Sequence, residues 1–249
     1  MDETTFSRRR LLALAGGVAA VSACSNITRP GPAPQAPNPP AQTTVSPTRA
    51  SAATSAVLLC RDAWGARPAR PGGTPHTITR MTIHHTAVVL EDNRNIASRL
   101  RQHQRFHQDE RGWIDIAYHV GVDRNGNIFE LRTPDLAGDT ATNYNPAGHF
   151  LVVCEGDFDH EEVTEAQLHG AALAFAWAAQ TFGVASDTLA GHRDVSADTA
   201  CPGSSLYAHV SSGDLQRRID DLLTAGTVNL QRVCGPEAAE IVAAIESGR

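Results

Sequence analysis

The distribution of proline divides this sequence into a part that cannot build a hydrophobic core and a part that can. Seven of the fourteen prolines lie in residues 25–57, where most other positions are Ser, Thr, Ala or Gln. Such a segment buries too little apolar surface to offset the entropy of ordering it, so we predict an extended linker over residues 24–57. The foldable chain is then a single domain that runs from Leu58 to residue 249.

The residues before the linker are typical of an export signal. The segment Ser7 to Leu12 reads SRRRLL and resembles the twin-arginine export motif, and Leu11 to Ala23 is an apolar stretch too short to span a bilayer. The stretch runs into VSAC, which ends at Cys24 and resembles a bacterial lipobox. We therefore predict a signal over residues 1–23, a lipidated Cys24, and a location in the cell envelope at the outer face of the cytoplasmic membrane. A signal followed by an incidental cysteine is the alternative.

The composition restricts the partners more than the fold. The chain is 41% hydrophobic and 19% charged, and 27 acidic residues against 21 basic ones give a net charge of −6. Binding to nucleic-acid phosphates needs an excess of Lys and Arg, so nucleic acid is not an expected partner. No run of roughly 18 apolar residues is present, which excludes a permanent membrane-spanning helix. We expect a monomer.

Hydrophobic periodicity predicts strands and helices in alternation. A hairpin turn at Asn125-Gly126 requires an antiparallel pair, and Thr164 to Gln167 form a capping box for a helix that ends at Gly183. The predicted fold class is therefore α/β, one domain with a mixed central β-sheet flanked by helices. The predicted strands are 81–84, 117–122, 127–131 and 150–154, and the other helices are 93–108, 214–224 and one after Pro236.

Three short motifs carry residues suited to binding a metal ion. They read IHHTA at 83–87, DIAYH at 115–119, and GHRD at 191–194 followed by ACPG at 200–203. His and Cys are natural Zn²⁺ ligands, and a catalytic zinc keeps three protein ligands with water in the fourth position. His84, His192 and Cys201 would form such a site. Their spacing alone is weak support, because any one of eleven histidines is more often a surface or hydrogen-bonded residue.

Together with RDAWGA at 61–66 and the extended stretch DIAYHVGVDRNG, these motifs give a more specific signal. In this order they resemble the bacterial peptidoglycan-recognition-protein and phage-lysozyme-type amidases, over about Cys60 to Leu206. Those proteins are zinc N-acetylmuramoyl-L-alanine amidases. The resemblance implies hydrolysis of the amide bond between N-acetylmuramic acid and L-alanine, with peptidoglycan or muropeptides as partners. Zinc would lower the pKa of its bound water to about 7 and polarise the scissile carbonyl.

The resemblance also assigns roles residue by residue. His84, His192 and Cys201 match the Zn²⁺ ligands, Tyr118 matches a tyrosine that assists catalysis near the zinc-bound water, and Thr199 matches a Lys or Thr aimed at the developing oxyanion. Each residue has a structural alternative. Neighbouring strand residues face opposite ways, so His85 is expected to miss the metal. Cys201 could instead form a disulfide, Tyr118 could be a core aromatic, and Thr199 could be a turn residue. His119, Arg193 and Asp194 are expected to be structural.

The sequence also departs from the family pattern. Relatives usually carry a histidine in the segment that here reads Ala137 to Thr140, which puts substrate contacts there in doubt. Cytoplasmic anhydro-muropeptide amidases place a catalytic Glu where this chain has Val153, so the chain follows the tyrosine branch. Glu155 lies nearby, but the strand alternation gives it a different role.

The remaining cysteines and the rival functions complete the prediction. Cys60 and Cys234 flank the domain, and a disulfide between them is expected in an oxidising envelope, whereas Cys154 should be a buried free thiol. A peptidoglycan-binding module without catalysis is the main rival, although such members lack the cysteine ligand that Cys201 matches. A zinc peptidase acting within the stem peptide and a purely structural lipoprotein are the others.

Overall fold

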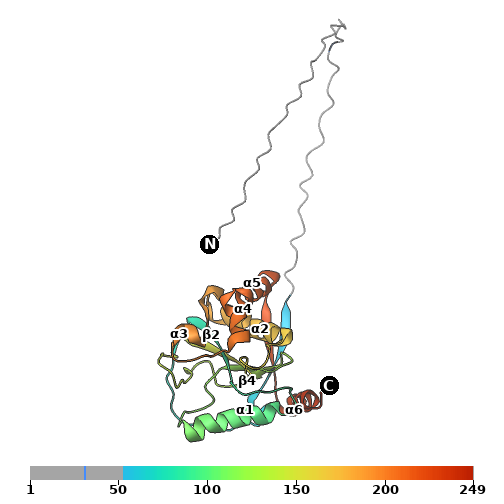
Figure 1. Cartoon of the computed structure of the whole chain (residues 1–249). Helices are drawn as coiled ribbons and strands as arrows, with labels where there is room; N and C mark the ends of the chain where they lie inside the picture. Colours follow the sequence, from blue (N-terminus) through green and yellow to red (C-terminus); the bar gives the residue numbers. More distant parts are fainter. Residues whose placement is uncertain (1–30, 32–52, 249) are drawn as a thin grey trace, which may run out of the picture. The chain divides into compact units, whose positions relative to one another are not determined.

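The computed structural model describes residue 31 and residues 53–248 of the chain (Figure 1). The predicted signal, the lipidated Cys24 and nearly all of the predicted linker therefore lie outside the described residues. The end of the linker is corrected, because Thr54–Leu59 form strand β1 and the ordered domain begins before Leu58. The strand forms there because a distant segment, Val228–Val233, supplies its backbone partners.

A seven-stranded sheet organises the domain, in the order β6-β2-β5-β3-β4-β1-β7. Its pairs are parallel except for β3 and β4, which form the antiparallel hairpin predicted at Asn125-Gly126. The mixed central sheet is thus confirmed. The strands are β1 Thr54–Leu59, β2 Arg80–His85, β3 Val120–Val122, β4 Ile128–Glu130, β5 His149–Cys154, β6 Leu189–Gly191 and β7 Val228–Val233.

Helices cover both faces of the sheet (Figure 1). Helix α2 and buried residues of α4 and α5 share one core cluster with Met81 and Ile83, while α1 and α6 share the other with Phe129 and Val153. The helices are α1 Ile96–Arg105, α2 Glu165–Phe182, α3 His192–Val195, α4 Ser204–Ser211, α5 Asp214–Ala225 and α6 Gly235–Glu246, with shorter helical turns η1 Arg61–Trp64, η2 Phe106–Glu110 and η3 Ser186–Thr188. No helix among the described residues is long and apolar enough to span a membrane.

The sequence predicted the ends of α2 accurately and those of α1 less accurately. Thr164 Oγ1 accepts a hydrogen bond from the Gln167 amide at 3.0 Å, and α2 ends at Gly183 in the left-handed conformation, as predicted. Helix α1 begins only at Ile96, and beyond Arg105 the helical chain continues as the π-type turn η2. Strand β3 is also shorter than predicted, because regular pairing with β4 begins at Val120.

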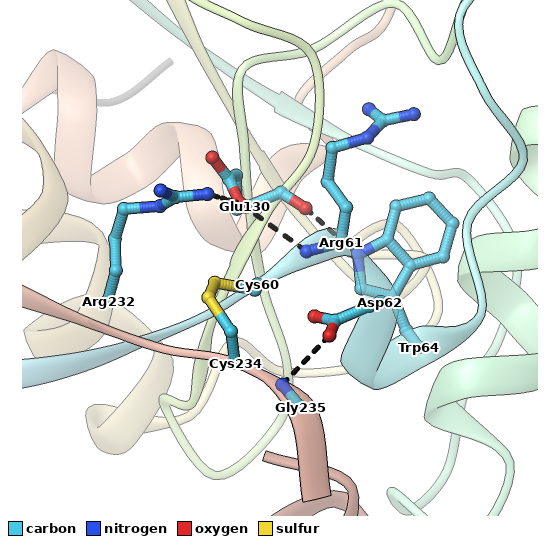
Figure 2. Close-up of a disulfide and its surroundings, with 8 residues drawn as sticks. All are labelled: Cys60, Arg61, Asp62, Trp64, Glu130, Arg232, Cys234 and Gly235. Atoms are coloured by element: carbon cyan, nitrogen blue, oxygen red, sulfur yellow. Dashed lines mark hydrogen bonds and ion pairs between the residues drawn. A yellow bond between two sulfur atoms is a disulfide. The ribbon is translucent and has the colours of Figure 1, made fainter.

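The predicted disulfide between Cys60 and Cys234 is confirmed and joins the ends of β1 and β7 (Figure 2). Beside it, the Asp62 carboxylate accepts a hydrogen bond from the Gly235 amide at 2.8 Å. Helix α6 then buries an apolar face against the second core cluster, and its Glu246 accepts a hydrogen bond from the Ala97 amide at 3.0 Å. The C-terminal segment therefore contacts the first turn of α1, the helix that borders the functional site.

Candidate metal centre

The parallel pairing of β2 and β6 brings two histidines together. Ile83 of β2 lies in register with Gly191 of β6, so the residues that follow them, His84 of β2 and His192 at the start of α3, meet at the same edge of the sheet. Their ring centroids lie 4.6 Å apart. Because Met81 and Ile83 face the α2 side, alternation directs His84 to the α1 side.

Cys201 completes the cluster from the loop between α3 and α4. Its Sγ lies 3.6 Å from Nδ1 of His84 and accepts a hydrogen bond from the His85 amide at 3.4 Å. One ligand atom each from His84, His192 and Cys201 lie within 4.8 Å of one another. Residues from two distant parts of the chain thus present two nitrogens and one sulfur to a common point.

Burial makes these groups suitable for a cation. Desolvation lowers the pKa of His84 well below its ordinary value and that of His192 to about 4, so both rings are neutral near pH 7. Within the described part of the chain, Nε2 of His84 is buried without a hydrogen-bond partner. Burial also raises the pKa of the Cys201 thiol to about 12, and a bound cation would favour the thiolate. This donor set fits Zn²⁺, which accepts imidazole nitrogen and thiolate sulfur.

Two residues that the sequence analysis missed hold the His192 ring. Thr142 Oγ1 lies 2.7 Å from Nε2 of His192, and the Tyr144 ring packs against the imidazole with centroids 5.0 Å apart. These contacts restrain the orientation of the ring. Both residues follow the segment in which relatives carry an additional histidine, and no local motif marks them.

Tyr118 and Thr199 both lie at the cluster. The Tyr118 ring centroid is 5.1 Å from that of His84, and burial raises the pKa of its phenol, so the hydroxyl keeps its proton. Thr199 Oγ1 accepts a hydrogen bond from the Cys201 amide at 3.1 Å, which stabilises the turn that presents Cys201.

The residues expected to be structural make structural contacts. His85 is absent from the three-residue cluster, and its ring stacks on Phe158 instead. His119 accepts a hydrogen bond from the Leu151 amide at 2.9 Å, and its Nε2 lies 3.0 Å from the Leu136 carbonyl oxygen. Asp194 and Arg193 brace the loop, through hydrogen bonds from Gly191 and Tyr207 to Asp194 and from Arg193 to the Ala200 carbonyl.

A cavity of about 280 Å³ opens at the cluster. Tyr118 and Thr199 line it together with the three candidate ligands. Polar and aromatic side chains that can contact a bound molecule also line it, namely Arg111, Trp113, Asp139, Thr140 and Thr142. The arrangement therefore combines a candidate cation site with room for an extended ligand.

This architecture, a mixed sheet flanked by helices with a His₂Cys cluster at its edge, is that of the amidase and peptidoglycan-recognition domains. The family model described as N-acetylmuramoyl-L-alanine amidase matches residues 74–204, and the chain belongs to that family. The predicted family is thus confirmed, while the relatives named next are animal proteins.

Known proteins resemble the chain in sequence and in fold. Peptidoglycan-recognition protein LB of Drosophila melanogaster is 34% identical over 180 residues, covering 67% of this chain and 73% of that protein. The N-acetylmuramoyl-L-alanine amidase of Sus scrofa is 33% identical over 155 residues, but these are 59% of this chain and only 25% of the pig protein. Among solved structures, a mutant of Drosophila PGRP-LB in complex with tracheal cytotoxin superposes with a TM-score of 0.56 at 30% identity, covering 62% of this chain and 93% of that one.

Proposed function

We propose that this protein is a zinc-dependent N-acetylmuramoyl-L-alanine amidase that cleaves the amide between N-acetylmuramic acid and L-alanine in peptidoglycan or its fragments. The observation that carries the proposal is the convergence of His84, His192 and Cys201 beside the protonated phenol of Tyr118. The family and the amidase relatives support the same reaction. The thiol of Cys201 favours catalysis over binding alone, because it supplies the third ligand of a catalytic zinc site.

The three ligands would hold Zn²⁺ through neutral imidazole nitrogen and thiolate sulfur. When bound, the metal supplies an activated water and polarises the scissile carbonyl. Thr142 and Tyr144 keep the His192 ring in place.

Tyr118 and Thr199 are proposed to stabilise the charge that develops on the carbonyl oxygen. The phenol stays protonated near pH 7 because burial raises its pKa, so its O–H remains a hydrogen-bond donor. The Thr199 hydroxyl accepts a bond from the Cys201 amide, which leaves its own proton free to donate.

The cellular setting rests on the sequence. We propose that the protein is exported, that lipid on Cys24 anchors it to the outer face of the cytoplasmic membrane, and that the proline-rich linker lets a monomeric domain reach the cell wall. Labelling with a lipid analogue tests the anchor. An unlabelled mature protein that lacks the first 23 residues would exclude lipidation.

The reaction is tested by digesting purified peptidoglycan with the full chain, with and without a chelator. We expect mass spectrometry to find stem peptides with a free L-alanine amine, together with muramic acid bearing a free lactyl carboxyl group. Chelation should abolish both products, and added Zn²⁺ should restore them. Cleavage within the stem peptide would instead identify a peptidase. Binding without any cleavage would identify a recognition module.

A further inference from the structure

The loop that follows β2, from Thr86 to Asp92, forms a wall of two adjoining cavities. Thr86 and Ala87 line the metal-centre cavity, and Thr86 and Val88 line a second cavity of about 390 Å³. The cavities share four lining residues, of which Thr86 is one. A molecule that extends from the metal centre into the second cavity therefore passes along this loop, which the proposed reaction does not use.

The backbone of this loop is strained. Ala87 and Glu91 have φ angles of 54° and 63°, and no other non-glycine residue in the described part of the chain has a positive φ. Between them, Val88 and Val89 are 41% and 45% exposed, and the backbone of residues 87–89 makes no hydrogen bond within residues 53–248. Left-handed backbone at such residues costs free energy and persists only where surrounding contacts fix it. The loop therefore needs support from outside itself.

The support comes from the segment that follows β5. At one end of the loop, Thr86 Oγ1 accepts a hydrogen bond from the Gly156 amide at 3.0 Å. At the other end, the Glu161 carboxylate accepts hydrogen bonds from the amides of Leu90 at 3.1 Å and Glu91 at 2.8 Å. The Leu90 side chain is also buried in the second core cluster. Glu161 thus binds the strained turn directly, at Glu91.

Glu161 is itself fixed by its neighbours. Its carboxylate also accepts a hydrogen bond from the Asp157 amide at 2.9 Å, and Nη1 of Arg124 lies 3.8 Å from its Oε1. Partial burial raises the pKa of Glu161, but the three amide hydrogen bonds and Arg124 outweigh it and hold the pKa below its ordinary value. Near pH 7 the group is therefore a carboxylate, which offers only acceptors to the amides that converge on it.

We propose that Glu161 is a positioning residue for substrate binding, which holds the loop so that Ala87 and Val88 contact a muropeptide in the two cavities. The proposal rests on the proposed function, because the substrate is the one named there. Glu161 lines neither cavity, so it acts through the loop, and the exposed side chain of Val88 supplies apolar contact area. Contacts made equally in the ground state and the transition state lower KM without changing kcat.

The first test measures the loop without using the reaction. Hydrogen exchange of the zinc-loaded full chain, followed by NMR, reports the protection of the Leu90 and Glu91 amides. In Glu161→Gln, which loses the charge and one acceptor oxygen, both should exchange at least about tenfold faster, the cost of about one charge-assisted hydrogen bond. The matched control is Glu162→Gln, which removes the neighbouring exposed carboxylate, an acceptor from Ser205 Oγ, and should leave this exchange unchanged.

The second test measures substrate binding. KM for a muropeptide should rise at least about tenfold in Glu161→Gln but not in Glu162→Gln, with kcat and zinc content unchanged in both. Val88→Ala, at an exposed position, tests the loop contact itself and also serves if Glu161→Gln fails to fold. It should raise KM while the amides of the loop keep their exchange rates.

The outcomes distinguish this proposal from the amidase proposal. Muropeptide binding without hydrolysis, measured by calorimetry and weakened in Glu161→Gln, would refute the amidase proposal and support the positioning role. Hydrolysis with an unchanged KM in Glu161→Gln would overturn the positioning role, even if the loop amides exchange faster, because Glu161 would then only stabilise the loop. An unchanged KM in Val88→Ala would overturn the proposed contact with the substrate.

Discussion

Two clusters of metal-ligating side chains lie at strand ends of this domain, and they have opposite chemistry. His84, His192 and Cys201 form one, and Cys60, Asp62 and Cys234 form the other. The first keeps its thiol free, whereas a disulfide closes the second (Figure 2). The same amino acid is thus a candidate metal ligand at one strand end and a covalent link at another.

The same structural rule produces both clusters. Leu59 of β1 lies in register with Val233 of β7, so the residues that follow, Cys60 and Cys234, come within 5.0 Å between Cα atoms. The register of Ile83 with Gly191 brings His84 to His192 in the same way. Parallel strand pairing therefore brings each pair of residues together, and the types of these side chains decide whether they can bind a metal or form a disulfide.

The largest expected effect comes from removing a ligand of the cluster formed by His84, His192 and Cys201. Cys201→Ala or His84→Ala should reduce bound zinc from one equivalent to near zero and abolish amide hydrolysis, because catalytic zinc needs all three protein ligands. Metal analysis and a muropeptide-release assay on the same samples check this. Cys154→Ala, which removes the other buried free thiol, is the control and should keep its zinc. An active, zinc-free Cys201→Ala variant would contradict the ligand set.

Removing the Cys60–Cys234 disulfide should affect stability rather than metal binding. Cys60→Ser with Cys234→Ser removes a link between residues 174 positions apart and should lower the free energy of unfolding by about 2–5 kcal/mol. Urea unfolding measures the loss, and zinc content should remain at one equivalent. Zinc loss in the folded double variant would show that the two clusters are coupled, through α6 and its contact with α1.

Removing the Tyr118 hydroxyl, which lies beside His84, should change the rate of hydrolysis without changing the zinc content. Tyr118→Phe keeps the ring but loses the donor, so kcat should fall ~10²–10³-fold while zinc content stays the same. The disulfide double variant serves as the comparison, since it should retain the wild-type kcat under conditions in which it is folded. A wild-type kcat in Tyr118→Phe would remove this residue from the mechanism.

The last prediction concerns the pH dependence of stability and involves histidines that belong to neither cluster. Burial lowers the pKa of both His107 and His119 to about 3, against an ordinary 6.5. Below pH 6.5 these histidines bind protons in the unfolded chain but stay neutral in the folded one. The free energy of unfolding should therefore be highest above pH 6.5 and should decrease as the pH falls towards 3. Each ring contributes about 1.4 kcal/mol per pH unit.

Unfolding of metal-free protein by urea at several pH values measures this slope. His107→Asn should reduce the slope of the free energy of unfolding against pH by the contribution of one histidine, about 1.4 kcal/mol per pH unit. The disulfide double variant should keep the wild-type slope, because its substitutions involve no histidine. An unchanged slope in His107→Asn would contradict a neutral His107 in the folded state.

The sequence predicted those features that depend on neighbouring residues. The capping box at Thr164 and the hairpin at Asn125-Gly126 formed as predicted, because their hydrogen bonds or turn geometry involve residues only a few positions apart. The start of β1 at Thr54 was missed, since its pairing depends on β7, far along the chain. The π-type turn at Phe106–Glu110 likewise had no local signal that we recognised.

The candidate site shows the same division. The motifs that contain His84, Tyr118, His192 and Cys201 identified the donors, because their residue types define what they can bind. Thr142 and Tyr144 went unnoticed, because a threonine or tyrosine in a loop has no special pattern until the fold brings it to His192.

By itself, the sequence determined the chemical groups, the caps and turns that begin and end elements, and the family that they indicate. The tertiary structure decided which groups meet: His84 with His192, Cys60 with Cys234, and Glu155 with His103. The physical reason is the distance along the chain over which each interaction acts. Backbone conformation and capping act over a few residues, whereas strand register and burial are set by the whole sheet.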